Sequence, residues 1–369
     1  MVCGAHAQSG LELPYDARHD WHRGQVDGID VISLPLAYSN RDSLVRRGWT
    51  FLRFALRSVR LALTLEADLV FATSTPITAV VPGLAAKWFR GLPFVFEVRD
   101  LWPELPRALG VRNPFLLGGM SLLEFLGYRS ADACVGLSPG IVEGIRARSS
   151  DRLPIAMIPN GCDLEVFHPA KRAPLSLPGI GQGDFVAGFT GAHGVANGLD
   201  ALLDVAAELK RRGDSRVKLA FIGDGKEKER LARLAAERGL DNCRFFPPVA
   251  KAELGAITAS LGCGLMVLRD VPAFYRGTSP NKFFDYLAAG IPVVNNYPGW
   301  LAGLIAENRC GIVVPPADPV AFADVLQRLA ADPDSCRAMG AAARALAEKE
   351  FARSRLAGEF VDFIETTAR

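Results

Sequence analysis

Short, uninterrupted apolar runs recur along the chain, and most of the segments between them carry apolar residues every three or four positions. Uninterrupted runs are typical of parallel strands buried on both faces, whereas the longer spacing is typical of amphipathic helices. Such strands in alternation with helices predict doubly wound α/β domains. The expected strands lie within residues 67–73, 92–100, 131–138, 155–161, 184–191, 217–225, 243–249, 263–269, 291–296 and 310–316.

A segment rich in Pro and Gly, residues 159–184, separates these strands into two series. Such a composition is typical of a connection between domains. We therefore expect a first domain over residues 1–165, a second domain over residues 166–350, and a C-terminal helix over residues 351–369 that packs back toward the first domain. Because parallel sheets bind ligands at the carboxyl ends of their strands, two facing domains predict a cleft lined by the loops after strands.

One expected helix, within RGTSPNKFFDYLAAGIPVV at residues 276–294, carries a carboxylate beside its apolar face. We expect Ser279 to cap this helix and Gly290 to end it, before a short buried strand. The first N–H groups of a helix lack internal partners and carry the positive end of its dipole. The start of this helix therefore favours an anion.

Two Gly-rich turns follow expected strands of the second domain, at residues 188–200 and 221–231. Glycine lets the backbone approach a phosphate closely, and Lys226 and Lys282 would add positive charge. With the helix start, these turns predict a pyrophosphate site, and Asp285 can then accept hydrogen bonds from the two hydroxyls of a ribose. The alternative is that the glycines only form tight turns, and that the lysines and Asp285 are solvated.

Four charged residues lie at and just after one expected strand of the first domain: Glu97, Arg99, Asp100 and Glu104. A single charged residue at a strand end is usually part of a solvated turn. Four within one short segment, beside Trp102, indicate a polar recognition surface that faces the cleft.

An amphipathic helix rich in arginine is expected near residues 46–60. The residues that define its basic and aromatic character are Arg46, Trp49, Arg53, Arg57 and Arg60. A basic helix with aromatic residues predicts contact with an anionic membrane surface. The alternative is a surface helix whose apolar side packs on the core of its domain, and both can hold.

The composition mainly excludes certain classes of protein and kinds of site. With 369 residues, 49% hydrophobic residues and a net charge of +2, the chain has an ordinary globular composition and is not basic enough for a nucleic-acid-binding domain. Its seven cysteines are widely spaced without a Cys-x-x-Cys pair, which argues against a disulfide framework or a zinc site and favours a reducing cytoplasm. The sequence shows no signal-peptide pattern, bilayer-spanning run, dinucleotide fingerprint or P-loop, and we expect no bound metal.

Several motifs, in order and over nearly the whole chain, resemble the retaining glycosyltransferases of family 4, which have the two-domain GT-B fold. The most specific is MIPNGCDLEVFHP at residues 157–169, which is similar to the family's Ile-Pro-Asn-Gly-x-Asp-x-x-x-Phe-x-Pro. The others are FEVRDLWPE, GLSPG, FIGDG, SPNKFFDYLAAGIPVV and CGIVVPPADP. The bacterial branch that adds sugars during assembly of O-antigen, capsule or exopolysaccharide looks most similar.

This resemblance implies both matches and departures. Asp285 takes the place of the second, ribose-binding Glu of the family's Glu, seven residues, Glu motif, whereas the first Glu falls on Gly277. The family's usual Arg and Lys after the first strand of the second domain fall on Ala192 and Asn197. Arg99 stands where many members have a His beside the transferred sugar. Family members also open with a strand, a Gly-rich loop and a helix, which we expect to be missing here because the opening residues look like the second strand.

The resemblance and the loop positions together give an expected site. Its donor-binding residues are Gly191, His193, Asn197, Gly223, Val249, Ser279, Asn281 and Asp285. Its catalytic residues are Arg99, Asp100, Lys226 and Lys282, of which the lysines would stabilise the leaving pyrophosphate. The acceptor side would carry Glu97 and Glu104.

The implied function is that of a hexosyltransferase-type enzyme that acts with retention. It would move a sugar from a nucleotide diphosphate, UDP rather than GDP, to a saccharide that is free or carried on a polyprenyl diphosphate. We expect no cofactor and no metal, and a place in the cytoplasm at the inner face of the plasma membrane. Two alternatives stay open: a GT-B nucleotide-sugar epimerase, which needs convergent carboxylates, and a non-catalytic subunit of a transferase pair, which the departures from the family pattern favour.

Overall fold

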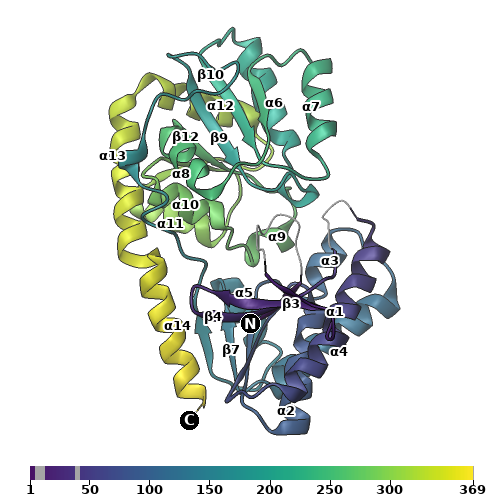
Figure 1. The fold of residues 1–369 in the computed structure, drawn as a ribbon. Helices are drawn as coiled ribbons and strands as arrows, with labels where there is room; N and C mark the ends of the chain where they lie inside the picture. The colour runs from purple at the N-terminus through teal and green to yellow at the C-terminus, as the bar shows by residue number, and fades with distance from the viewer. Residues whose placement is uncertain (5–12, 38–41, 369) are drawn as a thin grey trace.

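The expected alternation of strands and helices runs through the computed structural model, which describes residues 1–4, 13–37 and 42–368 (Figure 1). The second domain forms the upper part of Figure 1 and the first domain the lower part. Each strand predicted from an apolar run is present. Of the opening segment that looks like a second strand, residues 5–12 lie outside the described residues.

The second domain is built on one sheet. Its strands are β9 (Phe185–Thr190), β10 (Val217–Ile222), β11 (Cys243–Phe246), β12 (Cys263–Met266), β13 (Val293–Asn295) and β14 (Gly311–Val313). They are parallel and lie in the order β11-β10-β9-β12-β13-β14. The order changes direction between β9 and β12, where the loops of such a sheet diverge and leave room for a ligand.

Helices cover both faces of this sheet, because strands that are apolar on both sides need two covering layers. One face packs against α6 (Asp200–Arg211), α7 (Lys228–Glu237) and α12 (Pro319–Ala331). The other packs against α8 (Lys251–Ser260), α10 (Asn281–Ala288), α11 (Trp300–Asn308) and α13 (Pro333–Leu346). The α10 helix and the long loop before it thus lie on the second of these faces.

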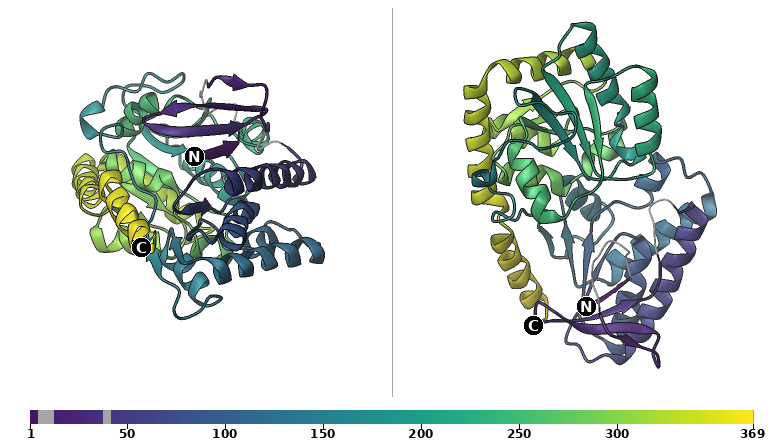
Figure 2. Two further views of the ribbon diagram at one scale, coloured as in Figure 1. Left: turned by 60° about the horizontal axis from the view of Figure 1, so that its bottom comes forward. Right: turned by 45° about the horizontal axis from the view of Figure 1, so that its top comes forward.

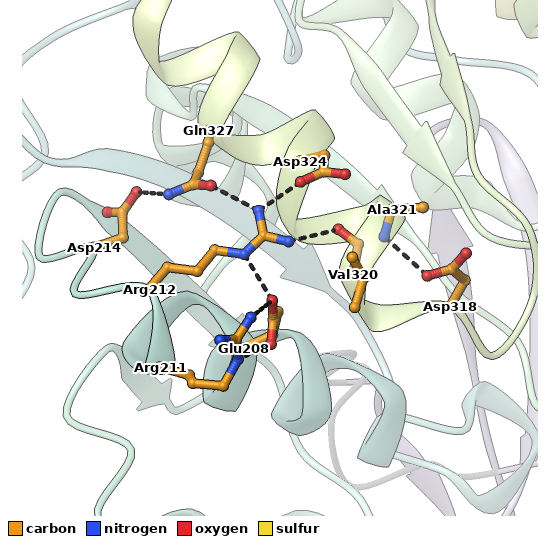
Figure 3. A network of polar contacts seen from close by, with 9 residues as sticks. All are labelled: Glu208, Arg211, Arg212, Asp214, Asp318, Val320, Ala321, Asp324 and Gln327. Carbon is orange, nitrogen blue, oxygen red and sulfur yellow. Dashed lines mark hydrogen bonds and ion pairs between the residues drawn. The ribbon is translucent and has the colours of Figure 1, made fainter.

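A polar network joins α6 to α12, which cover the same face of the sheet (Figure 3). The guanidinium of Arg212 donates to Glu208 at 2.7 Å and to the side-chain oxygen of Gln327 at 2.8 Å, and it also pairs with Asp324. Gln327 in turn donates to Asp214 at 2.8 Å. The Arg212 side chain is only 19% exposed, so its contacts with Glu208 and Gln327 are partly shielded from water and help to hold the two helices together, whereas Asp324 lies at the surface.

The first domain contains two sheets in its described part. The strands β5 (Val70–Thr73), β6 (Phe94–Val98), β7 (Ala133–Gly136) and β8 (Ile155–Met157) form a parallel sheet in that order. A smaller sheet, in the order β1-β4-β3-β2, is formed by β1 (Val2–Gly4), β2 (Tyr15–Asp16), β3 (Trp21–Val26) and β4 (Ile29–Leu34). The parallel α/β prediction is confirmed for the main sheets of both domains.

The smaller sheet differs from the prediction because β3 and β4 form an antiparallel hairpin. Its two-residue turn is Asp27-Gly28, with φ of 49° and 82°. A hairpin turn of this type needs positive φ at both central residues, which Asp-Gly tolerates and which matches the twist of the strands. The Asp-Gly pair was therefore a signal for the hairpin that the analysis of buried runs missed.

The helices of the first domain are α1 (Leu44–Thr64), α2 (Val80–Arg90), α3 (Glu104–Ala108), α4 (Pro114–Ser130) and α5 (Pro139–Arg146). α1 lies against α2, and α2 lies against α4. Close approach to the sheet depends on two glycines, since a Cβ at Gly83 would lie 2.2 Å from the ring of Phe94 and one at Gly127 would lie 3.1 Å from that of Phe96. The three helices thus form a layer on one side of the first domain.

The chain crosses between the domains twice. At the second crossing the backbone N–H of Cys162 donates to Phe351 and that of Arg353 donates to Cys162, at 2.9 and 3.0 Å. Beyond it, α14 (Arg353–Ala368) lies along the first domain (Figure 1, and Figure 2, right). Leu356 joins a core with the β6 and β7 strands, and the ring of Phe360 meets that of Phe71 edge-on at 5.0 Å.

Candidate functional site

The carboxyl ends of the two main sheets face each other across a contact between the domains. Ser138, just after β7, donates to the carbonyl of Arg276 at 3.5 Å, and the Asn160 side-chain amide donates to the carbonyl of Ser279 at 2.5 Å. Arg276 ends the short helix α9 (Pro272–Arg276), which also touches α3 and α5. The loops that follow the strands of both domains therefore border one cleft.

Gly140 sets how closely the domains approach, and its replacement by Ala is expected to separate them. A Cβ at Gly140 would lie 2.0 Å from the carbonyl oxygen of Arg276, so this backbone has to move. The matched control is Gly119→Ala on α4, where a Cβ meets nothing within 4 Å. Small-angle X-ray scattering should show a larger radius of gyration for Gly140→Ala only, and an unchanged curve would mean that the contact relaxes locally.

The helix that carries Asp285 begins at Asn281, and the predicted cap by Ser279 is wrong. Pro280 occupies the capping position and offers no side-chain hydrogen bond. The hydroxyl of Ser279 instead accepts the backbone N–H of Asn160 at 3.4 Å, since the domain contact draws it away from the helix. The first N–H groups of α10 therefore have no side-chain cap. The N–H of Phe283 donates to the carbonyl of Pro280 at 3.1 Å, and those before it are oriented toward an anion at the helix start.

Lys282 and Gly191 are brought together at this helix start. The Lys282 ammonium lies 3.5 Å from the centre of the Phe189 ring, and a Cβ at Gly191 would lie 3.5 Å from the same nitrogen. Gly191 has a φ of +123°, which side-chain-bearing residues rarely adopt. Burial lowers the pKa of Lys282 to about 7. An anion placed over Gly191 would meet this ammonium at close range.

The two Gly-rich turns stack on each other. A Cβ at Gly223 would lie 2.0 Å from the carbonyl oxygen of Gly191, so only glycine fits. Asn197 donates from its amide to the carbonyl of Ala192 at 2.8 Å and closes the first turn. Lys226 is exposed at the tip of the second turn, and no hydrogen bond or ion pair of its side chain occurs within the described residues. The turns thus form one backbone surface, with Lys282 beside it and Lys226 at its margin.

His193 does not line this surface with its side chain, contrary to the direct donor contact expected for it. The residue is fully buried, and its ring lies 6.0 to 6.4 Å from the ring centres of Phe189, Phe221 and Phe245. Burial, and then the charges of Lys228 and Lys282, lower the pKa of His193 to about 4. The ring is therefore neutral and buried beneath the turns, where neither of its nitrogens has a hydrogen-bond partner within the described residues. The backbone N–H and carbonyl of His193 are bonded to Asp224 and Glu227.

Asp285 lies one turn into α10 with its carboxylate half-buried. Burial raises its pKa to about 7, although the charges of Lys251 and Arg353 oppose this. Within the described residues, no hydrogen bond or ion pair to its carboxylate is present. The nearby cation Lys251 is instead paired with Asp163 at 3.1 Å. A half-buried carboxylate without a protein partner has lost part of its hydration, and hydroxyl donors of a ligand would replace it.

The remaining donor-side residues border the same region. Val249 follows β11 and packs partly buried against the core under α10, while Asn281 is exposed at the first position of α10. Asn281 thus adjoins Lys282 in the chain, whereas Val249 is placed only in the core that α10 shares.

Three residues that hold this site were not predicted. Lys228 donates to the carbonyls of Gly223 and Phe246 at 2.8 and 2.6 Å and so ties the ends of β10 and β11 together. The hydroxyl of Tyr286, fully buried, accepts the N–H of Thr190 at 2.9 Å. Asn160 holds Ser279 as described above. Lys228 and Asn160 lie within the GDGKEK and IPNG motifs, which were the available signals.

The charged segment of the first domain divides into two groups. Glu97 accepts the hydroxyl of Thr73 and lies 3.6 Å from Arg99, while Asp100 accepts the hydroxyl of Thr75 at 2.9 Å. Burial raises the pKa of Asp100. Glu104 stands apart on α3 in an ion pair with Arg148.

The separation of Glu104 is a correction to the single four-residue surface expected from the sequence. The same guanidinium of Arg148 reaches Glu124 at 3.0 Å, so Glu104 belongs to a cluster that joins α3 to α4. The first group, at the end of β6, faces the cleft because β6 is parallel to β7, whose carboxyl end meets Arg276.

The arginines of α1 are not all turned to solvent. Arg57 pairs with Asp20 at 2.9 Å and its side chain is 27% exposed. Arg46, Arg53 and Arg60 are exposed, although Arg46 also lies 3.6 Å from Asp42. The outer face of α1 also carries large apolar side chains, among them Trp49, which is 62% exposed, and Val45, Leu52 and Leu56. No helix in the described part of the chain is long and apolar enough to cross a membrane.

The chain is similar to known glycosyltransferases in both of its domains. The model of the "Glycosyl transferase 4-like domain" matches residues 3–161, and that of "Glycosyl transferases group 1" matches residues 178–346. The probable glycosyltransferase WbjE of Pseudomonas aeruginosa is 25% identical over 82% of this chain and 76% of its own length. A D-inositol 3-phosphate glycosyltransferase of Frankia alni is 33% identical over 72% of this chain and 67% of its own. Several other enzymes of that name are matched over less than half of their length.

Among solved structures, Anabaena HepE in complex with UDP-glucose superposes with a TM-score of 0.71 at 17% identity, covering 90% of this chain and 86% of that one. At this identity the likeness shows the fold, and the fold is the one read from the sheets above. Both domain models, the relatives and the architecture thus agree, and the chain is a glycosyltransferase of the GT-B fold that belongs to the family 4 type with a group 1 second domain.

Proposed function

We propose that this glycosyltransferase takes its sugar from a UDP-sugar and transfers it with retention of the anomeric configuration. The observation that carries the proposal is the arrangement at α10. Its uncapped start and Lys282 adjoin the Gly191 turn, and one helical turn further the Asp285 carboxylate has no partner within the described residues. A diphosphate over the turn and a ribose at the carboxylate satisfy both. The HepE relative, which binds UDP-glucose, supports the choice of base.

The proposed reaction needs no protein nucleophile. The bond between the anomeric carbon and the phosphate oxygen breaks with its electron pair on the phosphate, and the acceptor oxygen forms the new bond on the same face. The acceptor proton passes to the departing phosphate oxygen. The main task of the protein is then to stabilise the charge that grows on the phosphate, through Lys282 and the first N–H groups of α10. Glu97, Arg99 and Asp100 would orient the acceptor hydroxyl from the first domain.

The test begins with a panel of UDP- and GDP-sugars and thermal unfolding. A ligand at 100 times its dissociation constant stabilises the folded state by about 2.7 kcal/mol, so a donor should raise the melting temperature clearly. NMR of the product made from that donor should show the anomeric configuration retained and nucleotide released only with an acceptor. Inversion, or stabilisation by GDP-sugars alone, contradicts the proposal, and an isomerised free sugar indicates an epimerase.

We further propose that the first domain docks on an anionic membrane and that the acceptor is a lipid-linked saccharide of a surface polysaccharide. Large apolar side chains are exposed on all three helices of one layer, including Trp49 on α1, Phe89 on α2 and Phe115 on α4, with exposures of 62%, 76% and 90%. Arg53 and Arg60 adjoin them on α1. Exposed apolar residues beside basic ones are the pattern of a helix that lies in the membrane interface.

Replacing Trp49 and Phe115 together by Ser is expected to release the protein from vesicles of anionic lipid. The variant loses two aromatic side chains that would otherwise insert, whereas the folded core is untouched. Val361→Ser on α14 is the matched control, because Val361 is also half-exposed but lies away from this layer. Sedimentation with vesicles should show wild-type binding that weakens with salt, since screening acts over about 8 Å at physiological ionic strength. Equal sedimentation of both variants would refute membrane docking by this layer.

A further inference from the structure

Thr73 at the end of β5, and Ser74 and Thr75 directly after it, each form a hydrogen bond to one residue at or after the end of β6. Thr73 donates its hydroxyl to the carboxylate of Glu97, with which it is also paired in the strand register. The hydroxyl of Ser74 accepts the backbone N–H of Arg99 at 2.9 Å. Thr75 donates its hydroxyl to the carboxylate of Asp100 at 2.9 Å. The three contacts fix the whole polar group of the first domain from the neighbouring strand.

The three contacts hold both side chains and backbone of the group. The Glu97 and Asp100 contacts hold side-chain carboxylates, and the Ser74 contact holds the backbone between them. Ser74 is fully buried, so its hydroxyl serves only this purpose. The side chain of Glu97 is 15% exposed, so these contacts do not enclose it completely.

Thr75 adopts a backbone conformation that β-branched residues avoid. Its φ is +135°, far from the regions that threonine populates. Strained positions of this kind persist where the surrounding structure needs them, and they concentrate at functional sites. Here the unusual backbone turns the hydroxyl of Thr75 toward Asp100.

We propose that Thr73, Ser74 and Thr75 are positioning residues, which fix Glu97, Arg99 and Asp100 at the acceptor side of the cleft. The inference rests on the proposed function, because it takes this polar group to orient the acceptor. The contact of Thr75 is the one that can be isolated, since valine keeps its shape and removes only the hydroxyl. Burial raises the pKa of Asp100, and the hydrogen bond from Thr75 and the charge of Arg99 lower it. Loss of the hydroxyl should therefore raise that pKa further.

The test compares Thr75→Val with Thr75→Ser, which retains a hydroxyl. The matched control is Thr78→Val, the same change three residues on, where the hydroxyl meets only the carbonyl of Phe51. Carbon-13 NMR of protein labelled at the aspartate carboxyls, with Asp100→Asn to identify the resonance, gives the titration midpoint of Asp100. We expect this midpoint to rise by about one pH unit in Thr75→Val, a tenfold change in proton affinity, and to stay at the wild-type value in Thr75→Ser and Thr78→Val.

The second measurement is enzymatic activity. With a donor found in the panel above, Thr75→Val should lower acceptor-dependent nucleotide release about tenfold while the affinity for UDP stays unchanged, and Thr75→Ser should restore the rate. An Asp100 midpoint that does not move in Thr75→Val overturns the inference, and so does a shifted midpoint with a normal rate. If no variant, the wild type included, releases nucleotide from any donor, the proposed function fails, while the titration still decides whether Thr75 holds Asp100.

Discussion

Replacing Asp285 by Asn is expected to stabilise the protein at pH 8 and to weaken its binding of UDP at least tenfold. Burial raises the pKa of this carboxyl from 3.8 to about 7. Between these values the folded protein retains a proton that the unfolded chain has released, so the free energy of unfolding of the wild type falls as pH rises through this window. Each pH unit corresponds to about 1.4 kcal/mol, and we expect Asn to add about 2 to 4 kcal/mol above pH 7 and nothing below pH 4.

The loss of UDP affinity has a separate cause. A hydrogen bond to a charged group contributes about 1.5 to 3 kcal/mol, and the neutral amide cannot replace the carboxylate that accepts the ribose hydroxyls. Calorimetric titration at several pH values should show the UDP affinity of the wild type rising with pH through the pKa of Asp285, relative to that of Asp285→Asn. The comparison removes the titration of UDP itself, which is common to both proteins. Asp285→Glu should largely retain binding.

Asp163→Asn is the control for the stability measurement. Asp163 pairs with Lys251. Burial alone would raise the pKa of Asp163, but the hydrogen bonds from Lys251 and from the backbone N–H of Val166 outweigh it and lower this pKa. Its replacement should therefore lower the free energy of unfolding at pH 8, opposite to Asp285→Asn. Urea denaturation at pH 4, 6 and 8 gives both differences. Equal stability of Asp285→Asn and wild type at pH 8 would show that the carboxylate already has a partner, and the ribose assignment would fail.

Replacing Lys282 by Met is expected to lower kcat by about 100- to 1000-fold, with a much smaller change in KM for the donor. Negative charge on the leaving diphosphate grows toward the transition state, and removal of one donor from such a site costs about 2.7 to 4 kcal/mol. Lys282 sits where this charge would develop, because its ammonium adjoins Gly191 and α10 brings its own N–H groups to the same place. Methionine keeps the length of the side chain and its packing on the Phe189 ring.

Lys226→Met is the matched control and also tests an assignment from the sequence. Lys226 is exposed on the second turn, where water screens its charge, so we expect its replacement to change kcat less than threefold. Steady-state kinetics with the donor found in the panel gives kcat and KM for both variants. Weaker binding with normal turnover in Lys282→Met would mean that the lysine binds donor and transition state equally. A large loss in Lys226→Met would mean that the second turn closes over the donor.

The strands and helices were predictable because their signal is local. A run such as residues 217–222 is apolar at nearly every position, and only a strand covered on both faces hides all of it from water. The signal for α10 is also local, because its apolar residues recur at helical spacing. The hairpin of β3 and β4 was missed for a related reason, because its strands are half-exposed and their signal lies in the turn at Asp27-Gly28 rather than in a buried run.

The sequence by itself thus determined the alternating elements and the two domains of the family, since these depend on hydrophobic period, turn chemistry and motifs along the chain, whereas the roles of the site residues stay predictions. Only the tertiary structure decided which side chains meet. His193 lies in the core because three phenylalanine rings from β9, β10 and β11 close around it, and Ser279 leaves its helix because Asn160 of the other domain takes its hydroxyl. Contacts between residues far apart in sequence depend on how strands are ordered and how domains approach, and no local pattern encodes that geometry.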